Sequence, residues 1–139
     1  MRIVADTNVL ISATFWVGEA RRIMHEVQNG QITLLISAEL LDEFSNVLNY
    51  SDIQQKMERK SLEMQLSVEK VLTLAEIVIP DQKLDVVKSD PKDNKVVECA
   101  KAGNADFIIS YDKHLLSLVE FEGIRILAPS EFLRLLSKS

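Results

Sequence analysis

Short apolar segments alternate with amphipathic helical segments along this chain, and this alternation constrains its fold more than any other feature. Strand patterns occur at residues 2–5, 32–37, 76–80, 106–110 and 124–128, and helical patterns at 7–15, 19–30, 38–49, 51–60, 61–75, 93–103, 112–119 and 129–138. Strands separated by helices form a mainly parallel sheet that is covered on both faces. The pattern therefore predicts a single α/β domain over residues 1–139.

Residues that favour helix starts support several of these boundaries. Ser37 and Ser130 are placed to cap the helices at 38–49 and 129–138, because a serine hydroxyl accepts a hydrogen bond from a backbone N–H of the first turn. Ser51 and Gln54 form a capping-box pattern at the start of the segment 51–60. We expect these side chains to define where the helices begin.

The composition is that of a soluble globular protein, with 47% hydrophobic and 27% charged residues. No apolar stretch approaches the roughly 20 residues that span a bilayer, and the single cysteine, Cys99, fits a reducing compartment. We therefore expect a cytoplasmic protein that does not enter a membrane. The net charge of −5 disfavours nucleic-acid binding by bulk electrostatics, although carboxylates that hold divalent cations reverse the sign of the local field.

Two aspartates lie just beyond strands that are far apart in the sequence. Asp6 directly follows the strand 2–5, and Asp112 follows the strand 106–110 by two residues. Open parallel sheets bind ligands beyond the carboxyl ends of their strands, where the connecting loops begin. We expect both carboxylates to reach the same edge of the sheet.

The segment Ser-Asp-Pro-Lys-Asp-Asn at 89–94 places two further carboxylates at the start of a helix. Proline favours the first helical position, so Asp90 is the natural N-cap before Pro91. Asp93 is then the third helical residue, where an acid also favours the positive end of the helix dipole. Two interpretations remain open: a purely structural capping arrangement, or a cap by Asp90 that leaves Asp93 free to bind a metal ion.

Glu43 is a fourth candidate, on the predicted helix 38–49. The apolar residues of this helix form one face, and Glu43 lies on its border, roughly 100° from the centre at about 100° per residue. A carboxylate in this position is either an ordinary surface charge or a group that reaches the edge of the sheet. Both interpretations remain open.

Four carboxylates that converge in one pocket repel each other unless cations are present. Oxygen ligands of this kind select Mg²⁺ or Mn²⁺ over zinc, which prefers nitrogen and sulfur. His25 and His114 are isolated and lack zinc-ligand spacing. A hydrated magnesium ion suits phosphodiester hydrolysis, because it lowers the pKa of an attacking water. The acidic residues therefore predict a Mg²⁺- or Mn²⁺-dependent hydrolase.

Three segments together carry a resemblance to a known family. These are ADTNVLISA at the start, the helix LLDEFSNVL, and DPKDNKVVECAKAGNADFIISYDKHLL. Over about residues 2–130 the chain resembles the PIN domain family, and more closely its branch of toxin components from toxin–antitoxin pairs. The resemblance implies a three-layer α/β/α, PIN-like fold and a metal-dependent endoribonuclease.

The resemblance also implies roles for individual residues. The four acids of the family match Asp6, Glu43, Asp93 and Asp112, of which Asp6, Asp93 and Asp112 would hold the metal. Three further residues match polar or acidic positions that support such a site, namely Asn8, Ser110 and Asp90, and the role of Asp90 as ligand or cap stays open.

Two positions depart from the family pattern, which often has glycine before the fourth acid and aspartate two residues after it. Here these are Tyr111 and His114. Tyr111 could narrow the pocket, stack on a base of single-stranded RNA, or pack beside the end of the strand. The candidates for RNA contact are weaker, because each could be an ordinary surface charge: Lys92, Lys113 and Arg21, with Arg22 and Lys95 nearby.

The interpretation that we favour is a ribonuclease toxin that cleaves single-stranded or structured RNA. Its partners would be a cognate antitoxin protein and, by resemblance alone, a second copy in a homodimer. The alternative is a catalytically inactive PIN-like scaffold that binds RNA or protein. An aspartyl-phosphate phosphatase is disfavoured, because that chemistry needs an aspartate where this chain has Asn8.

Overall fold

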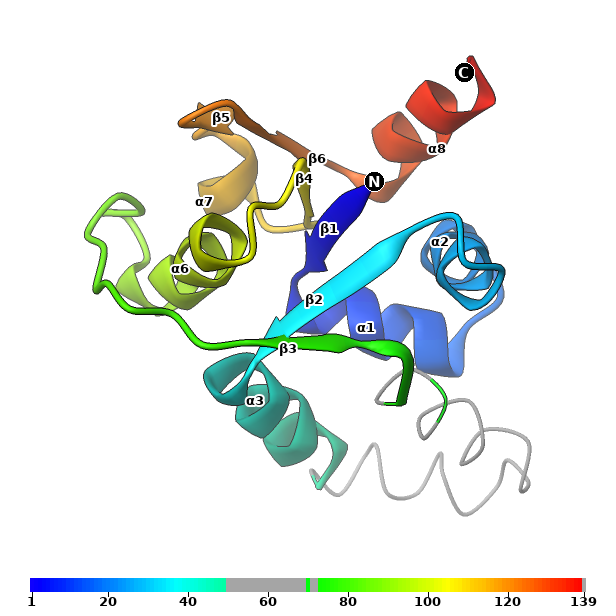
Figure 1. Cartoon of the computed structure of the whole chain (residues 1–139), viewed down its shortest axis with the longest axis horizontal. Coiled ribbons are helices and arrows are strands. Elements are labelled where there is room, and N and C mark those ends of the chain that lie inside the picture. The colour runs from blue at the N-terminus through cyan, green and yellow to red at the C-terminus, as the bar shows by residue number, and fades with distance from the viewer. Residues whose placement is uncertain (50–69, 71–72, 139) are drawn as a thin grey trace.

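The computed structural model describes residues 1–49, 70 and 73–138, and it is built around one six-stranded sheet (Figure 1). The strands lie in the order β3-β2-β1-β4-β6-β5. All neighbouring pairs are parallel except β5 and β6, which are antiparallel. The mainly parallel sheet predicted from the sequence is confirmed. The bounds are β1 Arg2–Ala5, β2 Thr33–Ser37, β3 Glu76–Val78, β4 Phe107–Ile109, β5 Glu120–Phe121 and β6 Ile124–Leu127.

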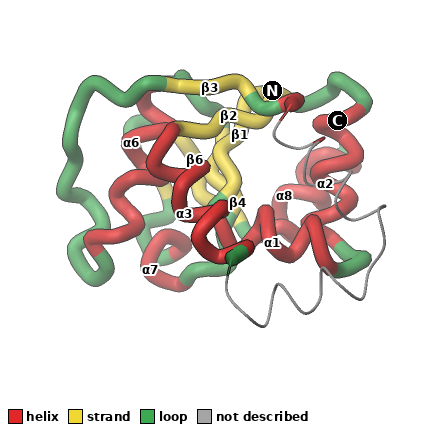
Figure 2. Tube along the Cα trace, turned by 90° about the horizontal axis from the view of Figure 1, so that it is seen from below, coloured by secondary structure: helices red, strands yellow, loops and turns green. Residues whose placement is uncertain are grey.

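Helices cover both faces of the sheet, as expected. Figure 2 shows α6 and α7 on one side and α1, α2 and α8 on the other, while α3 contacts both α1 and α6. None of the described helices is long and apolar enough to cross a membrane. The segments 51–60 and 61–75, including the Ser51 capping box, lie outside the described residues apart from 70 and 73–75. The bounds are α1 Thr7–Phe15, α2 Glu19–Gln28, α3 Ala38–Leu48, the 3₁₀ turn η1 Pro91–Asp93, α6 Asn94–Ala102, α7 Lys113–Leu116 and α8 Pro129–Ser137.

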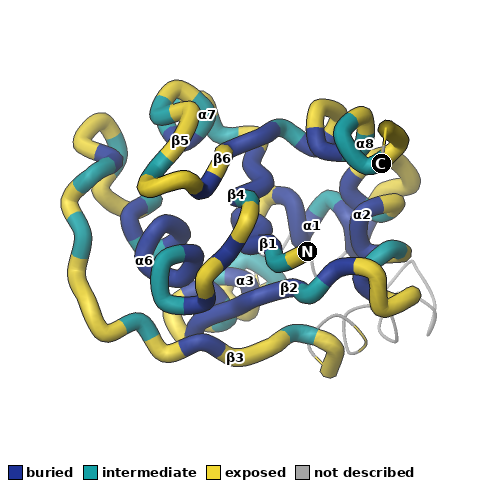
Figure 3. The backbone as a smooth tube through the Cα atoms, turned by 45° about the horizontal axis from the view of Figure 1, so that its top comes forward, coloured by how far each residue is buried: buried dark blue, intermediate teal, exposed yellow. Residues whose placement is uncertain are grey.

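The central strands are buried on both faces, which explains their unbroken apolar sequences. Ile3, Leu34 and Ile108, one from each of β1, β2 and β4, are completely inaccessible to solvent. Figure 3 shows this buried centre, with the edge strands β3 and β5 more exposed. The centre of the sheet is therefore a rigid base for the loops that follow β1 and β4.

Several local expectations need correction. Ser130 does not cap the last helix, because α8 begins at Pro129 with Ala128 as its N-cap, and Glu131 Oε1 instead accepts a hydrogen bond of 3.2 Å from the Ala128 N–H. The strand expected at 76–80 ends at Val78, and the helix expected at 112–119 ends at Leu116. The antiparallel strand β5 was not predicted; it reaches β6 through Gly123, which has a φ of 86°. Ser37 does cap α3, accepting a bond of 3.3 Å from the Leu40 N–H.

The connections run in opposite directions from the middle of the sheet. From β1 the chain moves to its neighbour β2, whereas β4 pairs with the other side of β1. In doubly wound sheets such a reversal opens a crevice beyond the carboxyl ends of the two strands, and ligands bind there. We therefore expect a functional site beyond the carboxyl ends of β1 and β4.

Candidate metal centre

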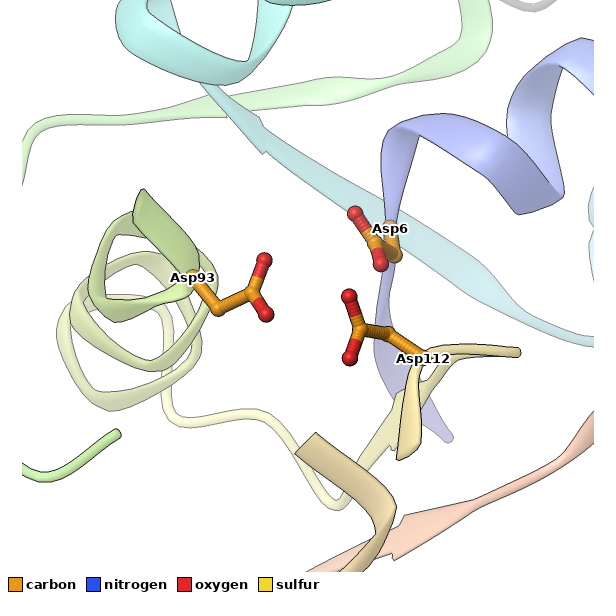
Figure 4. A group of neighbouring side chains, drawn as sticks. All are labelled: Asp6, Asp93 and Asp112. Atoms are coloured by element: carbon orange, nitrogen blue, oxygen red, sulfur yellow. The ribbon is translucent and has the colours of Figure 1, made fainter. Parts of the chain in front are cut away.

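Three aspartates meet beyond the carboxyl ends of β1 and β4. Asp6 follows β1 and is the N-cap of α1, Asp112 follows β4 and is the N-cap of α7, and Asp93 ends the turn η1 before α6. One carboxylate oxygen of each lies within 4.8 Å of those of the other two. Figure 4 shows the three side chains pointing toward one another from separate elements. Together they form an acidic cluster, which we call the aspartate cluster.

Hydrogen bonds hold two members of the cluster in place. Asp6 is only 5% exposed, and it accepts a bond of 2.7 Å from the Thr7 N–H through Oδ1 and one of 3.0 Å from the Ser110 hydroxyl through Oδ2. The fully buried Ser110 Oγ in turn accepts a bond of 2.9 Å from the Asp112 N–H. Asp112 Oδ1 accepts a bond of 2.7 Å from the His114 N–H, which completes the cap of α7. Ser110 therefore links Asp6 to the backbone that carries Asp112.

Asp93 is the least satisfied member of the cluster. Among the described residues its Oδ2 is buried and has no hydrogen-bond partner. Burial, followed by the negative charges of Asp112, Asp6 and Asp90, raises the pKa of Asp93 to about 7. Burial also raises the pKa of Asp6, although its bonds with Ser110 and Thr7 oppose the rise. In the part of the chain that the structure describes, no ion pair links the three aspartates to a positively charged side chain.

These features fit a divalent cation. A buried carboxylate oxygen without a partner is costly, and a metal ion satisfies it while cancelling the repulsion between the three acids. The donors are all carboxylate oxygens, which suit the hard ions Mg²⁺ and Mn²⁺. Asp6, Asp93 and Asp112 are therefore the residues that could hold such an ion.

Asp90 lies next to the cluster without joining it. It occupies the N-cap position of η1, as expected, but its side chain makes no capping hydrogen bond. Its carbonyl oxygen accepts a bond of 3.0 Å from the Asp93 N–H, and its charge contributes to the raised pKa of Asp93. Asp90 therefore acts on the cluster through its backbone and its charge.

Glu43 reaches the edge of the sheet but stands apart from the aspartate cluster. Its Oε1 accepts a hydrogen bond from the Thr7 hydroxyl, and its Oε2 lies 2.5 Å from the Lys95 ammonium. Thr7 adjoins Asp6, and the charge of Glu43 contributes to the raised pKa of Asp6. These contacts do not fit the interpretation of Glu43 as an ordinary surface charge; they fit the interpretation of Glu43 as a group that reaches the edge of the sheet.

The weaker candidates are placed differently. Asn8 is exposed, and within the part of the chain that the structure describes no hydrogen bond joins its side chain to the cluster. Arg21 donates to the carbonyl oxygens of Ala13 and Thr14 at the end of α1, at 3.1 and 3.0 Å. Lys92 and Lys113, neighbours of Asp93 and Asp112, are exposed. Tyr111, next to Asp112, is 47% exposed, so it does not pack away beside the strand.

Residues that sequence reasoning missed fix the position of Asp93. Asn94 Oδ1 accepts bonds of 3.0 and 2.8 Å from the N–H groups of Val86 and Val87. One turn later on α6, Glu98 Oε2 accepts a bond of 2.8 Å from the Leu84 N–H. Both side chains tie the loop before η1 to α6. The sequence contained one sign of these contacts: Asn94 and Glu98 are polar residues four positions apart, on the same helical face as the apolar Val97.

Comparison with known proteins agrees with this architecture. The model of the PIN domain family matches residues 2–114. PAE2754 from Pyrobaculum aerophilum is similar in structure, with a TM-score of 0.58, 14% identity and full coverage of both chains. A second similar structure is that of VapBC2 from Rickettsia felis bound to a DNA fragment from their promoter. It matches with a TM-score of 0.58 and 15% identity, over 91% of this chain and 97% of that chain. No curated protein matches in sequence. Because the match to the family model spans most of this chain, the chain belongs to the PIN domain family.

Proposed function

We propose that this protein is an endoribonuclease that hydrolyses RNA phosphodiester bonds with the help of Mg²⁺ or Mn²⁺. The observation that carries the proposal is the convergence of carboxylate oxygens of Asp6, Asp93 and Asp112 within 4.8 Å of one another, beyond the carboxyl ends of β1 and β4. Membership of the PIN domain family supports a nuclease, in line with the resemblance described above. In an inactive scaffold, the buried Oδ2 of Asp93, which has no hydrogen-bond partner among the described residues, would cost stability without any gain in function.

Asp6, Asp93 and Asp112 would hold the cation, directly or through water molecules. When bound, the ion supplies an activated water and a counter-charge for the phosphate. Ser110 and Thr7 keep Asp6 oriented, and Glu43 would help to orient the attacking water. Glu43 can do so while bonded to Thr7 and Lys95, because each carboxylate oxygen has a second lone pair.

The substrate would reach the cluster over an exposed surface beside it. Lys92 and Lys113 adjoin two of the aspartates and are free to contact phosphates, and the exposed ring of Tyr111 offers a surface for an unpaired base. Arg21 is a poorer candidate, since its guanidinium already binds the end of α1. Single-stranded RNA, or the loops of structured RNA, suits this arrangement.

We further propose that the protein is the toxin of a toxin–antitoxin pair, acts in the cytoplasm and forms a homodimer. The resemblance to the toxin branch supports this role, and the likeness in fold to VapBC2 is consistent with it. The cognate antitoxin would silence the enzyme by covering the aspartate cluster, for example with an arginine that meets the carboxylates.

The test compares the wild type with Asp112→Asn on mixed RNAs, with Mn²⁺ and with EDTA. Asparagine preserves the cap of α7, so the variant should fold. Cleavage should require Mn²⁺ and should fall more than about a hundredfold in Asp112→Asn, since even residues that only orient metal ligands cost up to about that factor. The matched control is Asp81→Asn, which changes an exposed aspartate in a loop and should not affect cleavage.

Two results would contradict the proposal. Equal cleavage by the wild type and Asp112→Asn would indicate a contaminating nuclease. Binding of RNA or protein without Mn²⁺-dependent cleavage would favour the inactive scaffold.

A further inference from the structure

We propose that the ammonium group of Lys95 takes the place of a second divalent cation beside Glu43, so that the aspartate cluster binds one ion. This inference rests on the proposed function and specifies the metal content of the same site. It concerns the fourth acid, Glu43, which is not among the three acids whose oxygens lie within 4.8 Å of one another.

Both oxygens of Glu43 are already engaged. Oε1 accepts the hydrogen bond of the Thr7 hydroxyl, and Oε2 forms the ion pair of 2.5 Å with Lys95. The side chains of Lys95 and Glu43 are only 22% and 31% exposed, so solvent screens this pair less than it screens a fully exposed one. A divalent ion on the same carboxylate would lie beside the ammonium group and be repelled by it.

The position of Lys95 on its helix supports the same role. Lys95 is the second residue of α6, close to the positive end of the helix dipole, where a cation is unfavourable. A nearby carboxylate offsets this cost, and Glu43 of α3 provides it. Lys95 follows Asp93, the N-cap of α6, by two residues, and its ion pair with Glu43 directs its ammonium group toward α3.

The charges of the site fit a single ion. Asp6, Asp93, Asp112 and Glu43 carry four negative charges when ionised, and Lys95 neutralises one of them. One divalent ion reduces the remaining charge to about −1, whereas two ions would leave about +1, with a second ion next to Lys95. Retaining Lys95 and one metal ion avoids this crowding of positive charges at Glu43.

The test counts Mn²⁺ ions per chain by isothermal titration calorimetry and by the electron paramagnetic resonance signal of free Mn²⁺. We expect one ion in the wild type and in Lys95→Arg, which keeps the positive charge. Lys95→Met should bind two ions. Adding Glu43→Gln to Lys95→Met should return the number to one, because the second ion would use the freed glutamate.

Lys101→Met is the matched control. It also removes a lysine of α6 that pairs with a glutamate, Glu122, at 3.1 Å, but at the opposite end of the helix from the cluster. It should bind one ion, and circular dichroism of each variant checks folding.

The outcomes separate this inference from the function on which it rests. Two ions in the wild type, or one ion in a folded Lys95→Met, would overturn the role of Lys95 and leave the nuclease intact. If the wild type binds no Mn²⁺, both the metal-dependent nuclease and the role of Lys95 are refuted. If Lys95→Met fails to fold, two ions in the wild type would still overturn the role of Lys95.

Discussion

Replacing Asp93 with asparagine should make the metal-free protein more stable. In the absence of a cation, Asp93 faces the carboxylates of Asp6 and Asp112, and its Oδ2 is buried without a partner among the described residues. Asparagine has a similar shape but no charge, so it relieves the repulsion without leaving a cavity.

The pKa of Asp93 sets the size and the pH dependence of the effect. A rise from the ordinary 3.8 to about 7 corresponds to about 4 kcal/mol at about 1.36 kcal/mol per pH unit. Because part of Asp93 is exposed, screening reduces this to about 2 kcal/mol. The folded state binds the proton of Asp93 more tightly than the unfolded state does. The stabilisation of the folded protein by this proton is therefore fully present below pH 3.8 and is lost as the pH rises through 7.

The assay is urea denaturation in EDTA at a series of pH values between 5.5 and 8.5. The wild type should lose stability relative to Asp93→Asn as the pH rises, and the variant should be more stable by about 2 kcal/mol at the alkaline end. Saturating Mn²⁺ should reverse the order, because a ligand at about a hundred times its Kd stabilises the protein that binds it by about 2.7 kcal/mol. Asp81→Asn is the control and should show no pH-dependent difference. An Asp93→Asn variant that is less stable than the wild type throughout would refute the reasoning.

Three further predictions follow from single contacts. Asn94→Ala should lower the free energy of unfolding by about 2 kcal/mol, because the N–H groups of Val86 and Val87 lose their acceptor; an unchanged urea midpoint would contradict this. Gly103→Ala should cost about 1 kcal/mol, since its Cβ would lie 2.7 and 3.0 Å from buried side chains of β2 and β3; a higher melting temperature would show that these side chains yield easily. Tyr111→Ala should raise the KM for single-stranded RNA about tenfold, as expected for one lost base stack, and Tyr111→Phe should not; equal KM values for both variants would exclude stacking.

The fold could be predicted largely from local patterns. The central strands are short apolar runs bounded by helical segments, and burial on both faces leaves them no other role. The strand β5 carried no such signal, because Glu120 and Phe121 pair only with one neighbour at the edge of the sheet. The cap of α8 was misassigned for a different reason. Proline favours the first helical position, so the helix begins at Pro129, before Ser130.

The candidate site could be predicted in part. Asp6 and Asp112 were predictable to lie at one edge, because the direction of each parallel strand decides where its carboxyl end lies. The partners of Glu43 were not predictable, since its bonds with Thr7 and Lys95 depend on how α3 and α6 approach β1. Helical periodicity describes one face of one helix and contains no information on which other helix meets it.

The pairing of β1 with β4 makes the order of synthesis important. Asp6 leaves the ribosome early, but β4, Ser110 and Asp112 follow about one hundred residues later. At about 5 to 20 residues per second this delay lasts on the order of 5 to 20 seconds. During that time the nascent chain has no complete ligand set, so the metal-dependent activity that we propose cannot begin before Asp112 has been synthesised.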